Sequence, residues 1–168
     1  MTIKIGDKLP PGTLSEYIDV ETEGCPLGPN AFAVEDLTRG RKVAIFGLPG
    51  AFTPTCSGQH VPGYVAHLDA LKAKGIDEVI CVSVNDAFVM GAWARDQKAV
   101  GKVRMMADGS AAYTKALGLE FDLTTRGMGV RCQRFSMVVD DGVVKLLNVE
   151  APGKYEVSDA ATMLKQLG

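Results

Sequence analysis

Cysteine 56 is the residue best placed for chemistry in this chain of 168 residues. It ends the stretch 49–56 (PGAFTPTC), which directly follows an apolar run. Thr53 is a typical helix N-cap, and Pro54 suits the first helical position, where no backbone N–H is needed. Cys56 would then lie in the first turn, beside unpaired amides and the positive end of the helix dipole. That environment favours the thiolate, so the sequence predicts a nucleophilic thiol.

The other cysteines are distant from Cys56 in the sequence. A dithiol site at a helix start has the pattern Cys-x-x-Cys, but here its first position is Thr53. Cys25, Cys81 and Cys132 are widely spaced, and they form no zinc-binding pattern with the two histidines. We therefore expect four free thiols, no metal, and chemistry at one thiol: attack on a peroxide, a disulfide or an electrophile.

Composition and charge describe an ordinary globular chain. The residues are 46% hydrophobic and 23% charged, with a net charge of −2. This predicts a single domain over 1–168 with a core of its own. Because the basic residues are scattered, we expect no nucleic-acid partner, and no apolar run is long enough to span a membrane. The N-terminus has no signal-peptide pattern, so we expect a cytoplasmic protein.

Apolar runs alternate with amphipathic segments, which predicts an α/β fold. Strands are expected at 17–20, 31–34, 43–48, 79–84, 103–106, 135–139 and 143–147. The last two flank Asp140, Asp141 and Gly142, a strong hairpin signal. The segment 118–129 is rich in turn-forming residues and is expected to be irregular.

Four helices are expected between these strands. One runs from Cys56 toward Lys74 and stops at Gly75. A second is capped by Asn85-Asp86 and has an apolar stripe of Phe88, Val89, Ala92 and Trp93. A third spans 111–117, and Ser158 caps the fourth.

Three blocks of the sequence resemble the peroxiredoxins, in particular the atypical type-II (peroxiredoxin-five-like) subgroup. The first is 49–57 (PGAFTPTCS), with the signature Pro-x-x-x-Thr-x-x-Cys. The second is 81–90 (CVSVNDAFVM), and the third is 131–136 (RCQRFS). The resemblance covers nearly the whole chain. It implies a thioredoxin-like fold, with a central mixed β-sheet flanked by helices and an N-terminal β extension.

The resemblance also implies a thiol-dependent peroxidase that acts on hydrogen peroxide and alkyl hydroperoxides without a cofactor. Cys56 matches the peroxidatic cysteine, which becomes a sulfenic acid. Arg134 matches an arginine that holds the thiolate and the peroxide oxygens. Thr53 matches the threonine that orients the peroxide, and Pro49 the proline that shields the sulfur. The backbone amides of Gly50 and Cys56 are the expected donors to the substrate.

Each of these residues also has a simpler interpretation. Thr53 can be only an N-cap, Pro49 only a loop former, and Arg134 an exposed strand charge. Arg131 competes with Arg134, although the Arg-Phe-Ser match favours Arg134. His60 lies one turn beyond Cys56, and we interpret it as packed at the pocket rim, outside the catalytic set.

Recycling of Cys56 is the open question of the sequence. Some members of the subgroup carry a resolving cysteine just before the last helix, where this chain has Ser158 and no cysteine. That departure favours an external reductant, either glutathione with glutaredoxin or thioredoxin. Cys81 is a candidate second redox cysteine or an inert core thiol. If the strand expected at 135–139 extends back to Cys132, this cysteine faces the same side as Arg134. It would then be an alternative resolving thiol or a neutral substitution.

Two other functions and one assembly remain open. A glutathione-dependent thiol transferase would use Cys56 on mixed disulfides, and a redox sensor would be oxidised without catalytic recycling. Related proteins place aromatic residues that match Phe52 and Phe88 in a dimer contact, so we expect a homodimer. Burial in the core is the simpler explanation for Phe88.

Overall fold

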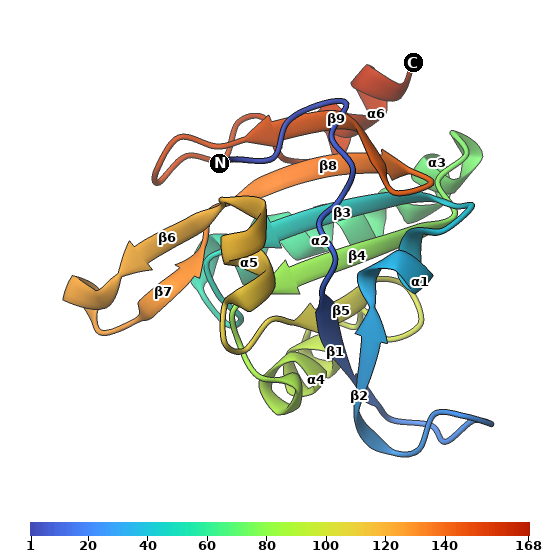
Figure 1. The fold of residues 1–168 in the computed structure, drawn as a ribbon, viewed down its shortest axis with the longest axis vertical. Coiled ribbons are helices and arrows are strands. Elements are labelled where there is room, and N and C mark those ends of the chain that lie inside the picture. Colours follow the sequence, from blue (N-terminus) through green and yellow to red (C-terminus); the bar gives the residue numbers. More distant parts are fainter.

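The computed structural model describes residues 1–168 and places a seven-stranded mixed sheet at the centre, in the order β2-β1-β5-β4-β3-β8-β9 (Figure 1). The strands are β1 (Thr13–Ile18), β2 (Gly28–Ala33), β3 (Lys42–Leu48), β4 (Glu78–Ser83), β5 (Arg104–Ala107), β8 (Phe135–Asp140) and β9 (Val143–Val149). The central β3, β4 and β5 are parallel, and the other strands add antiparallel. This confirms the predicted mixed sheet with an N-terminal β extension.

Helices cover both faces of this sheet, which is why its central strands are apolar almost without interruption. The helices α2 (Val61–Ala66), α3 (Leu68–Ala73), α4 (Ala87–Asp96) and α6 (Ala160–Leu167) enclose the core cluster around Phe46, Tyr64 and Trp93. On the opposite face, α1 (Val34–Thr38) and α5 (Ala112–Leu117) enclose a second cluster around Ile80, Phe135 and Met137. Figure 1 shows α1 and α5 in front of the sheet and α2 behind it. No helix has the length and apolar character needed to cross a membrane.

The helix that carries Cys56 begins at Pro54 as predicted, but it does not continue unbroken to Lys74. Cys56–His60 form a π turn (η1), α2 follows, and a break at His67 precedes α3. Pro62 supplies a physical reason for the wide turn, because it has no N–H to donate and its ring crowds the preceding carbonyls. Gly75, at φ +94°, follows the end of α3.

The segment 118–129 was predicted to be irregular, but it contains the first strand of a second, small sheet. β6 (Glu120–Leu123) pairs antiparallel with β7 (Gly129–Cys132), and a short 3-10 turn η2 (Thr124–Arg126) connects them. Gly127 and Gly129 both have positive φ, so the turn-forming residues reverse the chain between two strands. The hairpin projects from the main body of the molecule (Figure 1).

Several expected elements are correct in kind and shifted in position. The N-terminal strands lie three to four residues earlier than expected at their starts, and Val34 begins α1, which was not predicted. The hairpin after β8 is confirmed, with Asp141 and Gly142 both at positive φ. The last helix is capped by Asp159, which accepts from the Thr162 N–H, and not by Ser158.

The second helix is confirmed, but of its predicted apolar stripe only Trp93 is fully buried. Asp86 caps α4 by accepting the Val89 N–H at 2.8 Å. Phe88 is 65% exposed, so it is not part of the core. The buried positions of α4 are Ala87, Met90, Gly91, Trp93 and Ala94.

Candidate active site

The Cys56 sulfur and the Arg134 guanidinium meet at the end of β3. Cys56 is the third helical residue after the loop that follows Leu48, and its side chain is fully buried. Arg134 lies immediately before β8, which pairs with β3 so that Phe135 is opposite Gly47. This register brings Arg134 beside the loop, and its Nη2 donates to Cys56 Sγ at 3.2 Å. A guanidinium donor at this distance favours a thiolate on the sulfur.

Thr53 closes the loop between β3 and the helix. The sequence predicted that Thr53 caps the helix by accepting a backbone N–H. Its hydroxyl instead donates to the Gly50 carbonyl at 2.7 Å. The backbone carbonyl of Thr53 accepts the Ser57 N–H instead. Because its proton is directed at Gly50, the Thr53 oxygen is left to accept a hydrogen bond from a ligand.

Arg131 supports the same loop from β7. Its Nη1 donates to the Pro49 carbonyl at 3.2 Å, and its Nε donates to Met128 at 2.9 Å. A Cβ added at Gly50 would lie 2.6 Å from Arg131 Nη1, so glycine allows this close contact. Arg131 therefore braces Pro49 and Gly50, whereas Arg134 is the arginine that contacts the sulfur.

His60 belongs to this site, although the sequence analysis placed it outside. Its ring is fully buried, and its Nδ1 lies 2.9 Å from Arg134 Nη1. Its Nε2 lies 3.1 Å from the Ser158 carbonyl. Burial, and then the Arg134 charge, lower the pKa of His60 to about 3, so the ring is neutral at ordinary pH. The sequence did contain a sign of this position, because residues four apart on a helix, such as Cys56 and His60, lie on the same face.

A pocket of about 570 Å³ opens beside Thr53 and Arg134. Its walls come from the loop after β3, from β6 and the turn that follows it, from the two residues between β7 and β8, and from the segment after β9. The lining residues are Pro49, Thr53, Pro54, Thr55, Phe121, Leu123, Arg126, Met128, Gln133, Arg134, Glu150, Ala151, Pro152, Gly153 and Lys154. Three of them carry a positive charge: Arg126, Arg134 and Lys154.

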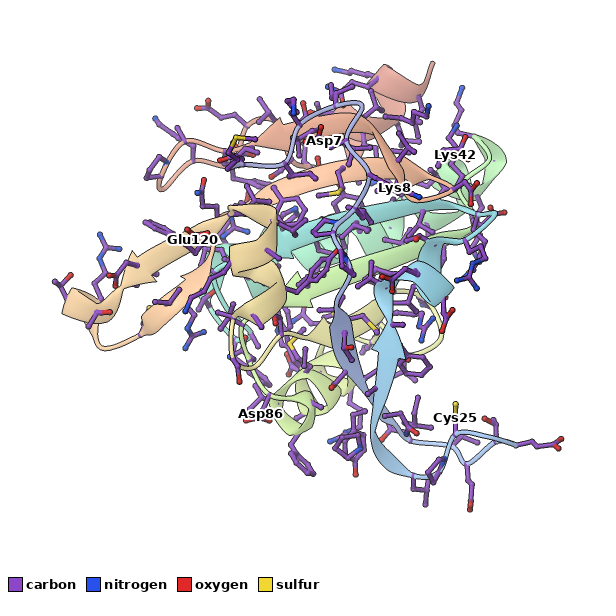
Figure 2. The ribbon with its side chains drawn as sticks, viewed as in Figure 1. Asp7, Lys8, Cys25, Lys42, Asp86 and Glu120 are labelled. Carbon is purple, nitrogen blue, oxygen red and sulfur yellow. The ribbon has the colours of Figure 1, made fainter.

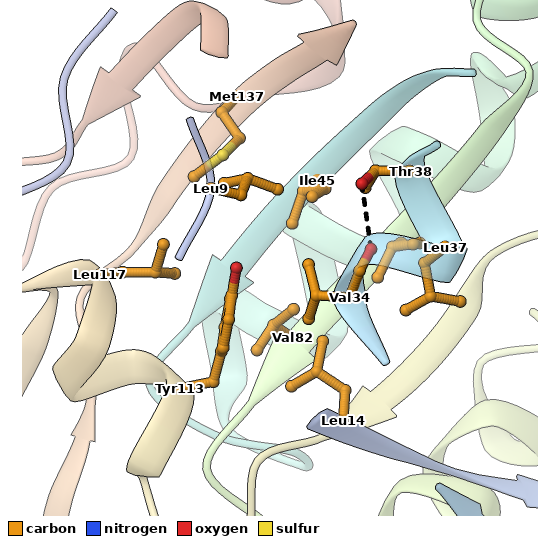
Figure 3. Close-up of a pocket in the computed structure, with 11 residues that line it drawn as sticks. Leu9, Leu14, Val34, Leu37, Thr38, Ile45, Val82, Tyr113, Leu117 and Met137 are labelled. Atoms are coloured by element: carbon orange, nitrogen blue, oxygen red, sulfur yellow. Dashed lines mark hydrogen bonds between the residues drawn. The ribbon is translucent and has the colours of Figure 1, made fainter. Parts of the chain in front are cut away.

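A second cavity lies on the other face of the sheet (Figure 3). It is closed in by α1, α5 and the N-terminal segment, and ten of its eleven lining residues are hydrophobic. Its volume of about 10 Å³ has room for one water at most. It has no group suited to catalysis and is a packing gap. No cluster of His, Cys, Asp or Glu is arranged to hold a metal ion.

The remaining cysteines lie in different surroundings. Cys81 is fully buried in β4, and burial raises the pKa of its thiol well above the ordinary value. Burial raises the pKa of Cys132 to about 12, and its thiol donates to the Gln133 carbonyl at 3.1 Å. Cys132 ends β7 and packs in the cluster around Ile80, and residues 133 and 134 belong to no strand, so the condition under which Cys132 would share a side with Arg134 is not met. Cys25 is half-buried on the projecting loop between β1 and β2 (Figure 2).

Comparisons with known proteins cover nearly the whole chain. The family model described as Redoxin matches residues 4–164. Peroxiredoxin-2B of Arabidopsis thaliana is 46% identical over 165 residues, 98% of each protein. The crystal structure of reduced Prx3 in complex with H2O2 from Vibrio vulnificus is 50% identical, with a TM-score of 0.91 over 99% of this chain and 100% of that one. A Burkholderia cenocepacia crystal structure, provisionally named a thioredoxin reductase, is 65% identical, with a TM-score of 0.99 over 100% of this chain and 99% of that one.

Proposed function

The chain belongs to the Redoxin family and is a peroxiredoxin, a thiol-dependent peroxidase, and from this premise we propose that Cys56 is the thiol that reduces the peroxide. The observation that supports this assignment is the 3.2 Å contact between Arg134 Nη2 and Cys56 Sγ. This contact lies beside the pocket of about 570 Å³ that opens at Thr53 and Arg134. Among the four cysteines, Cys56 alone has a cationic donor at hydrogen-bond distance.

In this mechanism the Cys56 thiolate attacks the distal oxygen of the peroxide. An S–O bond forms as the O–O bond breaks, and the electron pair leaves with the second oxygen as hydroxide or alkoxide. That oxygen takes up a proton to give water or an alcohol, and Cys56 becomes a sulfenic acid. Arg134 holds the thiolate and then donates to the oxygen on which charge develops.

The loop after β3 positions the substrate. Thr53 Oγ accepts the hydrogen bond of the peroxide O–H, because its own proton is directed at Gly50. The backbone N–H groups of Gly50 and Cys56 are the further donors that we assign to the peroxide. Pro49 lines the pocket and limits the access of water to the sulfur.

The test is steady-state consumption of hydrogen peroxide and of a small alkyl hydroperoxide. We expect Cys56→Ser to lose turnover and Cys81→Ala, a change at an equally buried thiol, to keep it. Undiminished turnover by Cys56→Ser would refute the assignment.

An external thiol restores Cys56 in the cycle that we propose. The first thiol condenses with the sulfenic acid to a mixed disulfide and water, and a second thiol releases the Cys56 thiolate and a disulfide. Buried Cys81 and Cys132 are poor internal partners, since burial raises the pKa of both thiols. The positive charges of Arg126 and Lys154 in the pocket favour a small anionic thiol such as glutathione, regenerated by glutaredoxin, over thioredoxin.

Parallel assays with the glutathione/glutaredoxin and thioredoxin systems distinguish the two reductants. We expect Arg126→Glu to raise the half-saturating concentration of glutathione, because it reverses a charge in the pocket. Arg39→Glu reverses a charge just after the end of α1, outside the pocket, and serves as the matched control. Equal half-saturating concentrations in wild type and Arg126→Glu would argue against glutathione binding there.

The other activities fit this site less well. The Burkholderia relative is named a reductase, and a dithiol reductase would need a second cysteine next to Cys56. Thr53 occupies the position where such a site has its first cysteine, so this chain lacks that partner thiol. A thiol transferase or a redox sensor would use the same thiol. Neither activity would need Arg134 placed to donate to peroxide oxygens.

We propose that the protein forms a homodimer through the surface around α4. Phe52 is 54% exposed and Phe88 is 65% exposed, so both aromatic rings are available to a partner. Phe52 lies against Trp93, and Phe88 lies against Tyr17, with ring centroids 6.3 Å and 5.9 Å apart. Measurement of the solution mass tests the dimer, and Phe88→Ser should shift it toward the monomer.

A further inference from the structure

Glu150, the residue after β9, has a buried carboxylate that neither lysine nor arginine neutralises. Only 6% of the residue is exposed. Its two oxygens accept the backbone N–H groups of Glu156, Val157 and Ser158 at 2.8–3.0 Å, and Oε2 accepts the Ser158 hydroxyl at 2.7 Å. Burial acts to raise the pKa of Glu150, but these hydrogen bonds outweigh it and lower the pKa overall. The ionised carboxylate therefore closes residues 150–158 into a fixed loop.

This loop presents the Ser158 carbonyl to the active site. That carbonyl accepts the Tyr64 hydroxyl at 2.9 Å and lies 3.1 Å from His60 Nε2. The other ring nitrogen, Nδ1, lies 2.9 Å from Arg134 Nη1. Because arginine can only donate, His60 Nδ1 must accept, and the ring proton must lie on Nε2 and point at Ser158.

The same loop holds Arg134 in two further ways. The Glu150 N–H donates to the Arg134 carbonyl at 2.9 Å. The Tyr155 ring lies 5.8 Å from the Arg134 guanidinium carbon and 5.2 Å from the His60 ring. The backbone and the guanidinium of Arg134 are thus both tied to residues 150–158.

From these contacts we infer that Glu150 is a positioning residue for Arg134. Its carboxylate holds the Ser158 carbonyl, which orients His60, and His60 then holds the guanidinium at Cys56. The inference rests on the proposed role of Cys56 and adds the requirement that the loop after β9 be closed for full reactivity. Glu150 contacts neither the sulfur nor the peroxide in this scheme. It is nevertheless necessary for the placement of both, because it positions Arg134.

The test compares Glu150→Gln with two variants in the same region. Glutamine has the same size, but it carries no negative charge and its terminal NH2 cannot accept, so only one of the two positions that accept the loop N–H groups remains an acceptor. We expect a fall of about tenfold in the single-turnover oxidation rate of Cys56 by hydrogen peroxide, since misplacing a reacting group by 1 Å can cost roughly 100-fold. The rate of Cys56 alkylation by iodoacetamide at pH 7 should fall as well, because Arg134 is the charged group that faces the sulfur.

Ser158→Ala and Thr162→Ala are the matched controls. Ser158→Ala removes one hydrogen bond to Glu150 but keeps the carbonyl, so its effect should be smaller. Thr162→Ala removes the 2.6 Å contact with Asp159 at the start of α6 and leaves Glu150 and Arg134 untouched. If Glu150→Gln matches Thr162→Ala in the rates of both oxidation and alkylation of Cys56, the inference is wrong.

Nitrogen NMR of His60 in the wild-type protein tests the relay even where Glu150→Gln fails to fold. The titratable groups that face this ring are Arg134, Tyr64, Tyr155, Glu150 and Asp159. We expect a neutral ring protonated on Nε2 from pH 5 to pH 8. A proton on Nδ1 would overturn the relay, and so would an imidazolium ion. This spectrum does not depend on peroxide turnover, so it separates failure of the relay from failure of the proposed role of Cys56.

Discussion

Cys56 and Cys81 are equally buried, yet their surroundings are opposite. Both side chains are fully buried in the core cluster around Phe46 and Trp93. Cys81 lies within β4, with Phe46 and Met105 at its level on the neighbouring strands. Cys56 lies at the start of a helix, and Arg134 donates to its sulfur. The comparison teaches that burial suppresses a thiol unless the fold supplies a charged donor with it.

Cys132 makes the same point from the other face of the sheet. Its sulfur has a hydrogen-bond partner, but that partner is the Gln133 carbonyl, an acceptor. An acceptor stabilises the protonated thiol, and burial acts in the same direction. The direction of the hydrogen bond to sulfur therefore separates Cys56 from Cys132.

The largest expected effect is the difference in alkylation between these thiols. On a Cys25→Ser background at pH 7, we expect iodoacetamide to label Cys56 and to spare Cys81 and Cys132 in the folded protein. With a pKa of about 12, Cys132 is a thiolate in only about one molecule in 10⁵ at that pH. Mass spectrometry of native and unfolded protein measures the contrast. Comparable labelling of Cys81 or Cys132 in the native protein would contradict the predicted difference in reactivity from Cys56.

The next effect comes from removing the donor that distinguishes Cys56. We expect Arg134→Gln to lower the rate of Cys56 oxidation by about 100-fold, the usual cost of losing one donor to developing charge. Arg134→Lys should recover part of the rate by keeping the charge. Arg41→Gln, which breaks a 2.8 Å ion pair with Glu78 at the other end of β3, is the control and should change the rate little. Stopped-flow fluorescence would follow the reaction, and a full rate in Arg134→Gln would show that the donor is dispensable.

The smallest effect is on stability and sharpens the role of His60. In the unfolded chain His60 takes up a proton near pH 6.5, whereas in the folded protein it stays neutral down to a pKa of about 3. The unfolded state thus binds more protons, so the free energy of unfolding falls as pH falls. Between pH 8 and pH 5 this loss is about 2 kcal/mol.

Urea titrations across that range measure the slope. His60→Gln should give a flatter curve than wild type. Parallel curves for wild type and His60→Gln would mean that His60 takes up its proton in the folded state as readily as in the unfolded chain.

Local rules in the sequence predicted the parts of this protein that depend on a few neighbouring residues. Pro54 at the first helical position placed Cys56 in the first turn, and Asp86 was identified as a cap. The reversal at Asp141 and Gly142 was predicted in the same way. Helix starts and tight turns are governed by φ, ψ and nearby backbone groups, so they can be derived before any tertiary contact is known.

Tertiary structure alone decided how the reactive thiol is surrounded. The Arg134–Cys56, Arg134–His60 and His60–Ser158 contacts join residues 78, 74 and 98 positions apart. They exist because β8 pairs with β3 and because Glu150 closes the loop before α6. The surroundings of Cys132 depend on distant segments as well, since its thiol packs in the cluster around Ile80. The sequence by itself determined where the nucleophile stands, and only the packing of distant segments decided which groups hold it ready to react.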